Sequence, residues 1–227
     1  MSSTRSELHR VAAHVLGRRR FAVSGHFGLR ASPGGIATPA FGPEPEVLRI
    51  AGSTLVREVG TESSSVDLPG STLADLARFA GVDLRSEYSA GANTPPVGSL
   101  DDPLCLDHGV LVELFAWFDL GLRVLDTCTT RLGERWSSST IQLWPEHFDV
   151  GTAVSREGGP NVNLGFSSGD AFSPDPYVYV GPWGPERPGD AEFWNAPFGA
   201  YVTREQAADA LSALDFFGTA LDLLSKG

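Results

Sequence analysis

The longest regular pattern of apolar residues runs from about Leu104 to Leu132 and has the spacing of an α-helix. Its apolar positions recur every three or four residues, at Leu111, Phe115, Phe118, Leu122 and Leu125. Other apolar residues occupy the remaining faces, which indicates a helix buried on most sides at the centre of the fold. We therefore expect the side chains of Leu114 and Phe118 to be almost fully buried.

Three shorter helices are also predicted. The first covers residues 3–17 and ends at Gly17, and the second covers residues 72–80. The third follows Thr203-Arg204-Glu205-Gln206, which has the form of a capping box. Its expected inner stripe consists of Ala207, Leu211, Leu214, Leu221 and Leu224.

Strand patterns occur in two parts of the chain. From the apolar Phe21-Ala22-Val23 to about Val66, short runs rich in Val, Leu and Ile alternate with turns. After Gly133, four more strands are predicted at 139–144, 147–155, 161–167 and 177–180. Glu157-Gly158-Gly159-Pro160 has turn residues at every position, so we expect a hairpin between the second and third of these strands.

These elements predict an α+β fold with a mainly antiparallel sheet and a long central helix. Two organisations fit: a single domain over residues 1–227, or two similar halves, 1–85 and 104–227, joined by a Gly/Pro/Ser-rich linker at 86–103. The second would be a duplicated helix-sheet-helix unit. It is suggested by Phe41-Gly42-Pro43-Glu44, which resembles Trp183-Gly184-Pro185-Glu186. The alternative explanation is shared turn chemistry, because Pro, Gly and Glu recur in loops.

Charge narrows the range of partners. The chain has 17 basic and 28 acidic residues and a formal charge of −11, so its average field repels phosphate backbones and anionic lipids. We expect neither a nucleic acid nor a membrane partner. The most apolar stretch, 109–125, contains Glu113, Asp119 and Arg123, which is typical of a buried helix rather than a membrane span.

The composition also limits chemistry and location. The only lysine is Lys226, so a Schiff-base lysine, a phosphate-loop lysine and a lysine general base are excluded unless the end of the chain folds back into a site. Cys105 and Cys128 would lie roughly 34 Å apart in the predicted long helix and could not pair. Residues 1–16 lack the apolar core of a signal peptide, so cytoplasm is the expected location. The arginine, alanine and glycine bias suggests a bacterial protein.

No common catalytic or nucleotide-binding motif occurs, but the later strands divide by alternation into two faces. One set is apolar and suits a core. The other mixes aromatic, amide and hydroxyl groups, which is typical of a small-molecule cleft, and comprises Gln142, Trp144, Asn161, Asn163, Tyr177 and Tyr179. The alternative for this second set is a solvated sheet face.

One constellation could carry catalysis. In an extended strand His147 and Asp149 point to the same side, and Asp170 follows the strand that pairs with theirs. An imidazole oriented by a carboxylate can act as a general base. The alternative for His147 is a hydrogen-bonded structural residue. His9 and His14 stand five apart on a helix, so they diverge and are expected to be solvated.

Part of the second half resembles a known family. Over about residues 136–185 the chain resembles an uncharacterised bacterial family, a domain of unknown function. The runs that carry the resemblance are Leu143-Trp144-Pro145-Glu146-His147-Phe148-Asp149, Gly165 to Asp170, Pro176 to Val180 and Pro182-Trp183. Ser168 stands where that pattern has Pro. The resemblance implies no activity, cofactor or catalytic residues.

Two functions from different classes follow. The first is a small-molecule binding protein, or an enzyme of unassigned mechanism, with its cleft on the polar-aromatic face and with no cofactor. The second is a non-catalytic structural or interaction module, in which the aromatic residues contact another protein or a second copy of the chain.

Overall fold

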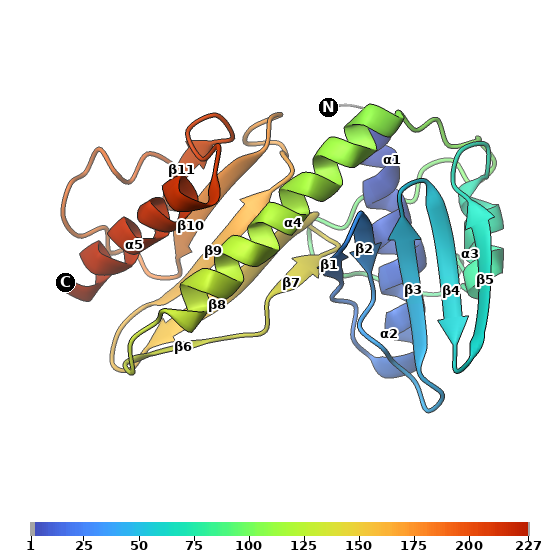
Figure 1. The fold of residues 1–227 in the computed structure, drawn as a ribbon, viewed down its shortest axis with the longest axis horizontal. Helices are drawn as coiled ribbons and strands as arrows, with labels where there is room; N and C mark the ends of the chain where they lie inside the picture. The colour runs from blue at the N-terminus through green and yellow to red at the C-terminus, as the bar shows by residue number, and fades with distance from the viewer. Residues whose placement is uncertain (1–2, 227) are drawn as a thin grey trace. The chain divides into compact units, whose positions relative to one another are not determined.

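The computed structural model describes residues 3–226, which form α-helices and two antiparallel sheets (Figure 1). Two units can be distinguished. Unit 1 contains the residues up to Asp119 together with Leu143–Phe148, and unit 2 contains Leu120–Gln142 and the residues from Asp149 onward. The predicted α+β class, with mainly antiparallel sheet and one long helix, is confirmed.

Unit 1 begins with a continuous helical segment made of α1 (Ser3–Val11), the π-helical η1 (Ala12–Gly17) and α2 (Arg18–Ser24). The predictions of a helix end at Gly17 and of a strand at 21–23 are therefore wrong. Gly17 keeps helical angles, φ −61° and ψ −46°, and a Cβ there would lie 2.8 Å from the Tyr88 hydroxyl. This glycine allows close packing, whereas the helix ends at Gly25, which has φ 73°.

The sheet of unit 1 is a meander of five strands in the order of the chain. They are β1 (Arg30–Ser32), β2 (Gly35–Ala37), β3 (Glu46–Ala51), β4 (Thr54–Val59) and β5 (Glu62–Asp67). Residues of β3 alternate between buried and half-buried, and Leu48 and Ile50 are fully buried. In Figure 1, α1 and α2 lie along one face of this sheet.

Helix α3 (Leu73–Ala80) forms where the sequence predicted it. Thr72 and Asp75 form a capping box, and Leu73, Leu76, Ala77 and Ala80 are buried. A left-handed Gly81 ends the helix. Both end signals are local in sequence, which explains why this prediction succeeded.

The long helix α4 (His108–Thr130) is shorter than predicted, because Asp107 accepts a hydrogen bond from the amide of Val110 at its start. Leu114 and Phe118 are 6% and 0% exposed, which confirms their predicted burial. Cys105 precedes the helix and is exposed, Cys128 is buried within it, and both thiols are free. Within residues 3–226 no helix is both long enough and apolar enough to cross a membrane.

The sheet of unit 2 contains a second antiparallel meander in the order β11-β10-β9-β8-β6. These strands are β6 (Trp136–Ser138), β8 (Asp149–Arg156), β9 (Asn161–Ser167), β10 (Tyr177–Pro182) and β11 (Ala200–Thr203). The predicted hairpin at 157–160 is confirmed, because Ser155 of β8 lies opposite Asn161 of β9. Strand β7 (Gln142–Trp144) leads into unit 1, where Leu143 exchanges two backbone hydrogen bonds with Leu29.

Helix α5 (Ala210–Lys226) begins later than expected. Thr203 and Gln206 do form reciprocal hydrogen bonds, but the chain only turns there. Asp209 caps the helix by accepting from the amide of Ser212 at 2.8 Å. The inner stripe is therefore shifted, and Leu211, predicted to be buried, is 70% exposed. The buried residues of α5 are Ala213, Phe217, Ala220, Leu221 and Leu224.

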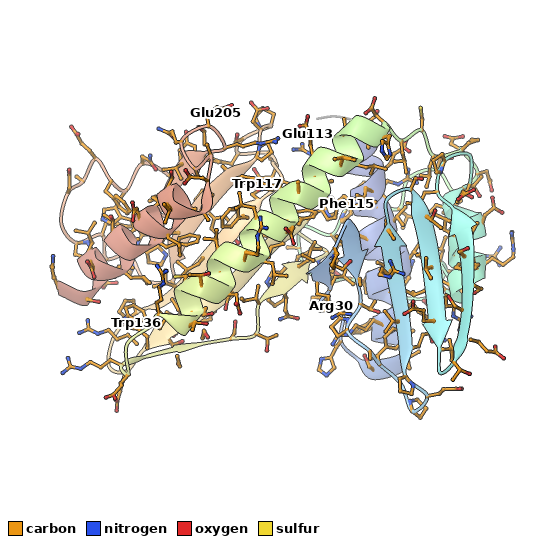
Figure 2. All side chains as sticks on the ribbon, in the orientation of Figure 1. Arg30, Glu113, Phe115, Trp117, Trp136 and Glu205 are labelled. Carbon is orange, nitrogen blue, oxygen red and sulfur yellow. The ribbon has the colours of Figure 1, made fainter. Side chains whose placement is uncertain are left out.

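Both units share one order of elements: a helix, an antiparallel meander and another helix. Arg30 and Trp136, labelled in Figure 2, are the first residues of the two meanders. The two similar sequence groups do not, however, connect equivalent strands of the two meanders. Phe41–Glu44 connects a second strand to a third, whereas Trp183–Glu186 connects β10 to the last strand. The duplication stays a prediction, and it rests on element order rather than on these groups.

Candidate functional site

Strand register assembles a polar-aromatic face on the sheet of unit 2. Asp149, Ser167 and Tyr177 form one row across β8, β9 and β10, and Gly151, Gly165 and Tyr179 form the next. The opposite face holds the apolar partners, all fully buried: Val162, Leu164, Phe166, Val178 and Val180. The predicted division of β9 and β10 into two faces is therefore present.

Tyr179 and Asp149 form the centre of this face. The Tyr179 hydroxyl donates a hydrogen bond to Asp149 Oδ2, and Asp149 is only 5% exposed. The ring lies over two glycines: a Cβ on Gly165 would be 2.4 Å from Tyr179 Cζ, and a Cβ on Gly151 would be 3.3 Å from its hydroxyl. Burial first, and the Asp149 charge second, raise the pKa of Tyr179 well above its usual value.

Tyr177 and Asp170 form a second pair beside the first. The Tyr177 hydroxyl donates to Asp170 Oδ2 at 2.8 Å. Asp170 Oδ1 accepts from the amides of Phe172 at 2.8 Å and Ser173 at 3.2 Å, so this carboxylate also holds the loop that follows β9. Burial, followed by the bond to Asp170, raises the pKa of Tyr177. Both tyrosines are therefore neutral hydrogen-bond donors near pH 7.

Aromatic rings border these pairs. Phe172 stands edge-on to Phe198 at 5.0 Å and to Tyr201 at 4.9 Å, measured between ring centroids. It also contacts Tyr177 at 5.6 Å. Phe172 is 40% exposed, so this aromatic group reaches the surface of the unit. The face therefore combines carboxylates, hydroxyl donors and ring faces.

The remaining residues of the predicted cleft divide between the units. Asn161 and Asn163 lie on β9 on the same side as the tyrosine pairs, and Asn163 Oδ1 accepts from Trp183 Nε1 at 2.9 Å. Gln142 is half-buried at the end of a segment of unit 2. Trp144 belongs to unit 1, where its ring lies 6.3 Å from that of Phe27.

His147 also lies in unit 1, whereas Asp149 and Asp170 lie in unit 2. The prediction that an extended strand orients His147 and Asp149 alike is wrong, because residues 145–148 form a turn in which Phe148 has φ 56°. His147 Nε2 is 3.3 Å from Glu146 Oε1, and Nδ1 is 3.4 Å from Asn93 Nδ2. A catalytic role for His147, Asp149 and Asp170 stays a prediction.

His9 and His14 are not solvated, contrary to prediction. His9 stacks on Phe148 at 4.9 Å, and its Nε2 donates to the Pro145 carbonyl at 2.8 Å. Burial is the main cause that lowers the pKa of His9 to about 4. His14 is 3% exposed, donates from Nε2 to the Pro95 carbonyl at 2.7 Å, and has a pKa lowered by burial.

A group in unit 1 that sequence reasoning missed surrounds Tyr88; we call His14, Arg18, Phe21 and Tyr88 the Tyr88 cluster. The Tyr88 ring contacts His14 at 6.2 Å and Phe21 at 5.6 Å. Arg18 Cζ lies 5.3 Å from its centroid, and Arg18 is 5% exposed. The sequence does contain a signal for this cluster, because residues 14, 18 and 21 are spaced to lie on one face of a helix. The predicted helix end at Gly17 separated His14 from Arg18 and Phe21 and so hid this spacing.

Residues 3–226 contain no group of three His, Cys, Asp or Glu side chains arranged to hold a metal ion. No protein-family model, curated protein or solved structure matches the chain.

Proposed function

We propose that unit 2 binds a small organic cation on the polar-aromatic face of its sheet. The observation that carries this proposal is the pair of tyrosine-aspartate hydrogen bonds, Tyr179 to Asp149 and Tyr177 to Asp170, next to the exposed ring of Phe172. The proposal makes the protein a binding protein, or an enzyme that acts on such a cation.

The chemistry of the face favours positive charge. Carboxylates accept hydrogen bonds and attract cations, and the faces of aromatic rings attract cations through their quadrupole. The two tyrosines remain protonated because their pKa values are raised, so their hydroxyl groups donate to the carboxyl groups and orient them. An ammonium or guanidinium group with an apolar body matches this combination.

Calorimetric titration with choline, putrescine and agmatine tests the proposal, with acetate and succinate as anionic comparisons. We expect at least one cation to bind and the anions not to bind. Asp149→Asn keeps the side-chain shape but removes the charge, and should weaken cation binding about tenfold or more. Asp175→Asn is the matched control, because it removes an exposed carboxylate from the neighbouring loop. Equal affinity of wild type and Asp149→Asn would contradict the proposal.

A second candidate function is a protein-interaction module. It is favoured by the exposure of two large aromatic side chains in unit 2, Trp183 at 64% and Phe172 at 40%. If a second copy of the chain is the partner, light scattering over a concentration series should show a dimer that Trp183→Ala weakens. A monomer at every concentration would contradict self-association.

A further inference from the structure

Arg18 in unit 1 is a buried guanidinium that has no carboxylate within ion-pair distance among the described residues, although the charge of Asp83 acts on it from farther away. Its side chain is only 5% exposed. The next residue shows the contrast: Arg19 is more exposed, and its Nη2 pairs with Glu46 Oε2 at 2.8 Å. A buried charge is costly unless it is paired, so Arg18 calls for an explanation.

Its neighbours carry unused polar atoms as well. Arg18 Nε and Nη1, His14 Nδ1 and the Tyr88 hydroxyl are all inaccessible to solvent and have no hydrogen-bond partner among the described residues. These atoms belong to side chains that contact one another around the Tyr88 ring. Buried polar atoms usually have a hydrogen-bond partner. Three neighbouring side chains with unpaired buried polar atoms therefore point to a ligand.

The backbone of this region holds the cluster in place. His14 and Gly17 lie in the π-helical η1, a geometry often found at functional sites. Arg18 Nη2 donates to the Ser86 carbonyl, and His14 Nε2 donates to the Pro95 carbonyl, so both are tied to the loop that carries Tyr88. Gly17 leaves room for the Tyr88 hydroxyl. The three polar side chains are thus fixed by contacts that leave their other polar atoms unused.

We propose that His14, Arg18 and Tyr88 form a binding site for a small molecule that carries an oxyanion next to a hydroxyl group, as hydroxy acids and singly protonated phosphate do. Arg18 and Tyr88 supply N–H and O–H donors for the oxyanion. This site lies in unit 1 and is independent of the cation site proposed for unit 2.

The hydroxyl requirement follows from His14. A carbonyl oxygen can only accept, so His14 Nε2 carries the proton that is shared with Pro95. Burial keeps the ring neutral by lowering its pKa, and Nδ1 is then an acceptor that fits a ligand hydroxyl. Two acidic groups act on the cluster by their charge, Glu146 on Tyr88 and Asp83 on Arg18, and burial raises the pKa of Glu146.

Thermal unfolding of wild type and Arg18→Met tests the site with lactate, glycolate, propionate and inorganic phosphate, at ionic strength matched with sodium chloride. We expect lactate, glycolate or phosphate at about 100 Kd to raise the Tm of wild type by roughly 5 to 10 °C, and propionate to raise it less. Arg18→Met should lose this response yet be at least as stable as wild type without ligand, because it removes an unpaired buried charge. A merely structural Arg18 would instead make Arg18→Met less stable.

Arg19→Met is the matched control on the same helix. It breaks the pair with Glu46, so it should be less stable than wild type but should keep the full response to the anions. If Arg18→Met does not fold, titration of wild type followed by the Arg18 Nε–H resonance gives the same answer. An equal response of Arg18→Met and wild type, no response of wild type to any of the four anions, or an Arg18 resonance that does not move would overturn the proposal.

Discussion

Tyr179 on β10 reaches across the whole of β9 to donate its hydroxyl proton to Asp149 on β8. The ring can cross the middle strand because Gly165 presents no side chain beneath it, and Gly151 leaves room for the hydroxyl on the far strand. A bond that spans three strands ties the central part of the unit 2 sheet together on its polar face. It also fixes the orientation of a buried carboxylate.

Gly165→Ala should disrupt this crossing. The added Cβ would lie 2.4 Å from Tyr179 Cζ, a separation that forces the ring off Asp149 or shifts the strand. We expect a loss of about 1 to 3 kcal/mol in the free energy of unfolding, measured by urea denaturation. Gly133→Ala is the control, since a Cβ there meets nothing within 4 Å. Equal stability of Gly165→Ala and wild type would show that the ring does not lie over this glycine.

Alkaline pH should destabilise unit 2 through Tyr177 and Tyr179. Folding raises the pKa of both tyrosines above 10, the pKa of tyrosine in the unfolded chain. The stability that the protonated tyrosines contribute is therefore complete below pH 10 and is lost as the pH rises toward their pKa values in the folded chain. The Tm of wild type should therefore fall between pH 9 and pH 11 more steeply than that of a Tyr177→Phe, Tyr179→Phe double variant. Tyr201→Phe, on the adjacent strand β11, should keep the wild-type slope. Parallel curves for wild type and the double variant would contradict the raised pKa values.

Local signals predicted part of the fold. Helix α3 and the 157–160 hairpin were found because capping residues and turn residues next to each element decide where it ends. Gly17 and Thr203 carry equally good local signals, yet the helix continues through one and starts well after the other. In the first case the glycine serves close packing, because a Cβ on Gly17 would lie 2.8 Å from the hydroxyl of Tyr88, a residue distant in sequence. Such contacts cannot be derived from spacing.

The candidate sites show the same limit. Alternation placed Tyr177 and Tyr179 on one face, but their pairing with Asp170 and Asp149 depends on strand register and on glycines that leave space for the rings. An extended strand through His147 and Asp149 would place both side chains on one side, but the turn at 145–148 breaks that alternation.

Phe118→Ala should remove a large part of the core of unit 1. Phe118 is fully buried and stands edge-on to Phe148 at 5.1 Å. We expect a loss of about 3 to 5 kcal/mol in the free energy of unfolding, measured by urea denaturation. Val112→Ala provides the comparison on the same helix, because Val112 is 53% exposed and its truncation should change stability by no more than about 0.5 kcal/mol. Similar losses in the two variants would argue against the packing of Phe118.

Acid should destabilise unit 1 through His9, and the direction follows from its pKa. Burial against Phe148, aided by repulsion from the charge of Arg5 and from His14 once His14 is protonated, lowers the pKa to about 4, while the bond to the Pro145 carbonyl opposes this shift. The unfolded chain, with a histidine pKa of 6.5, therefore binds a proton more readily than the folded chain. The stability contributed by neutral His9 is complete above pH 6.5 and is lost as pH falls toward 4, at a cost of up to about 3 kcal/mol.

His9→Gln cannot titrate, so its urea midpoint should fall less than that of wild type between pH 7 and pH 4.5. His26→Gln removes an exposed histidine and serves as the control, which should follow wild type. If His9→Gln and His26→Gln lose stability equally across this range, His9 is not the group that senses acid.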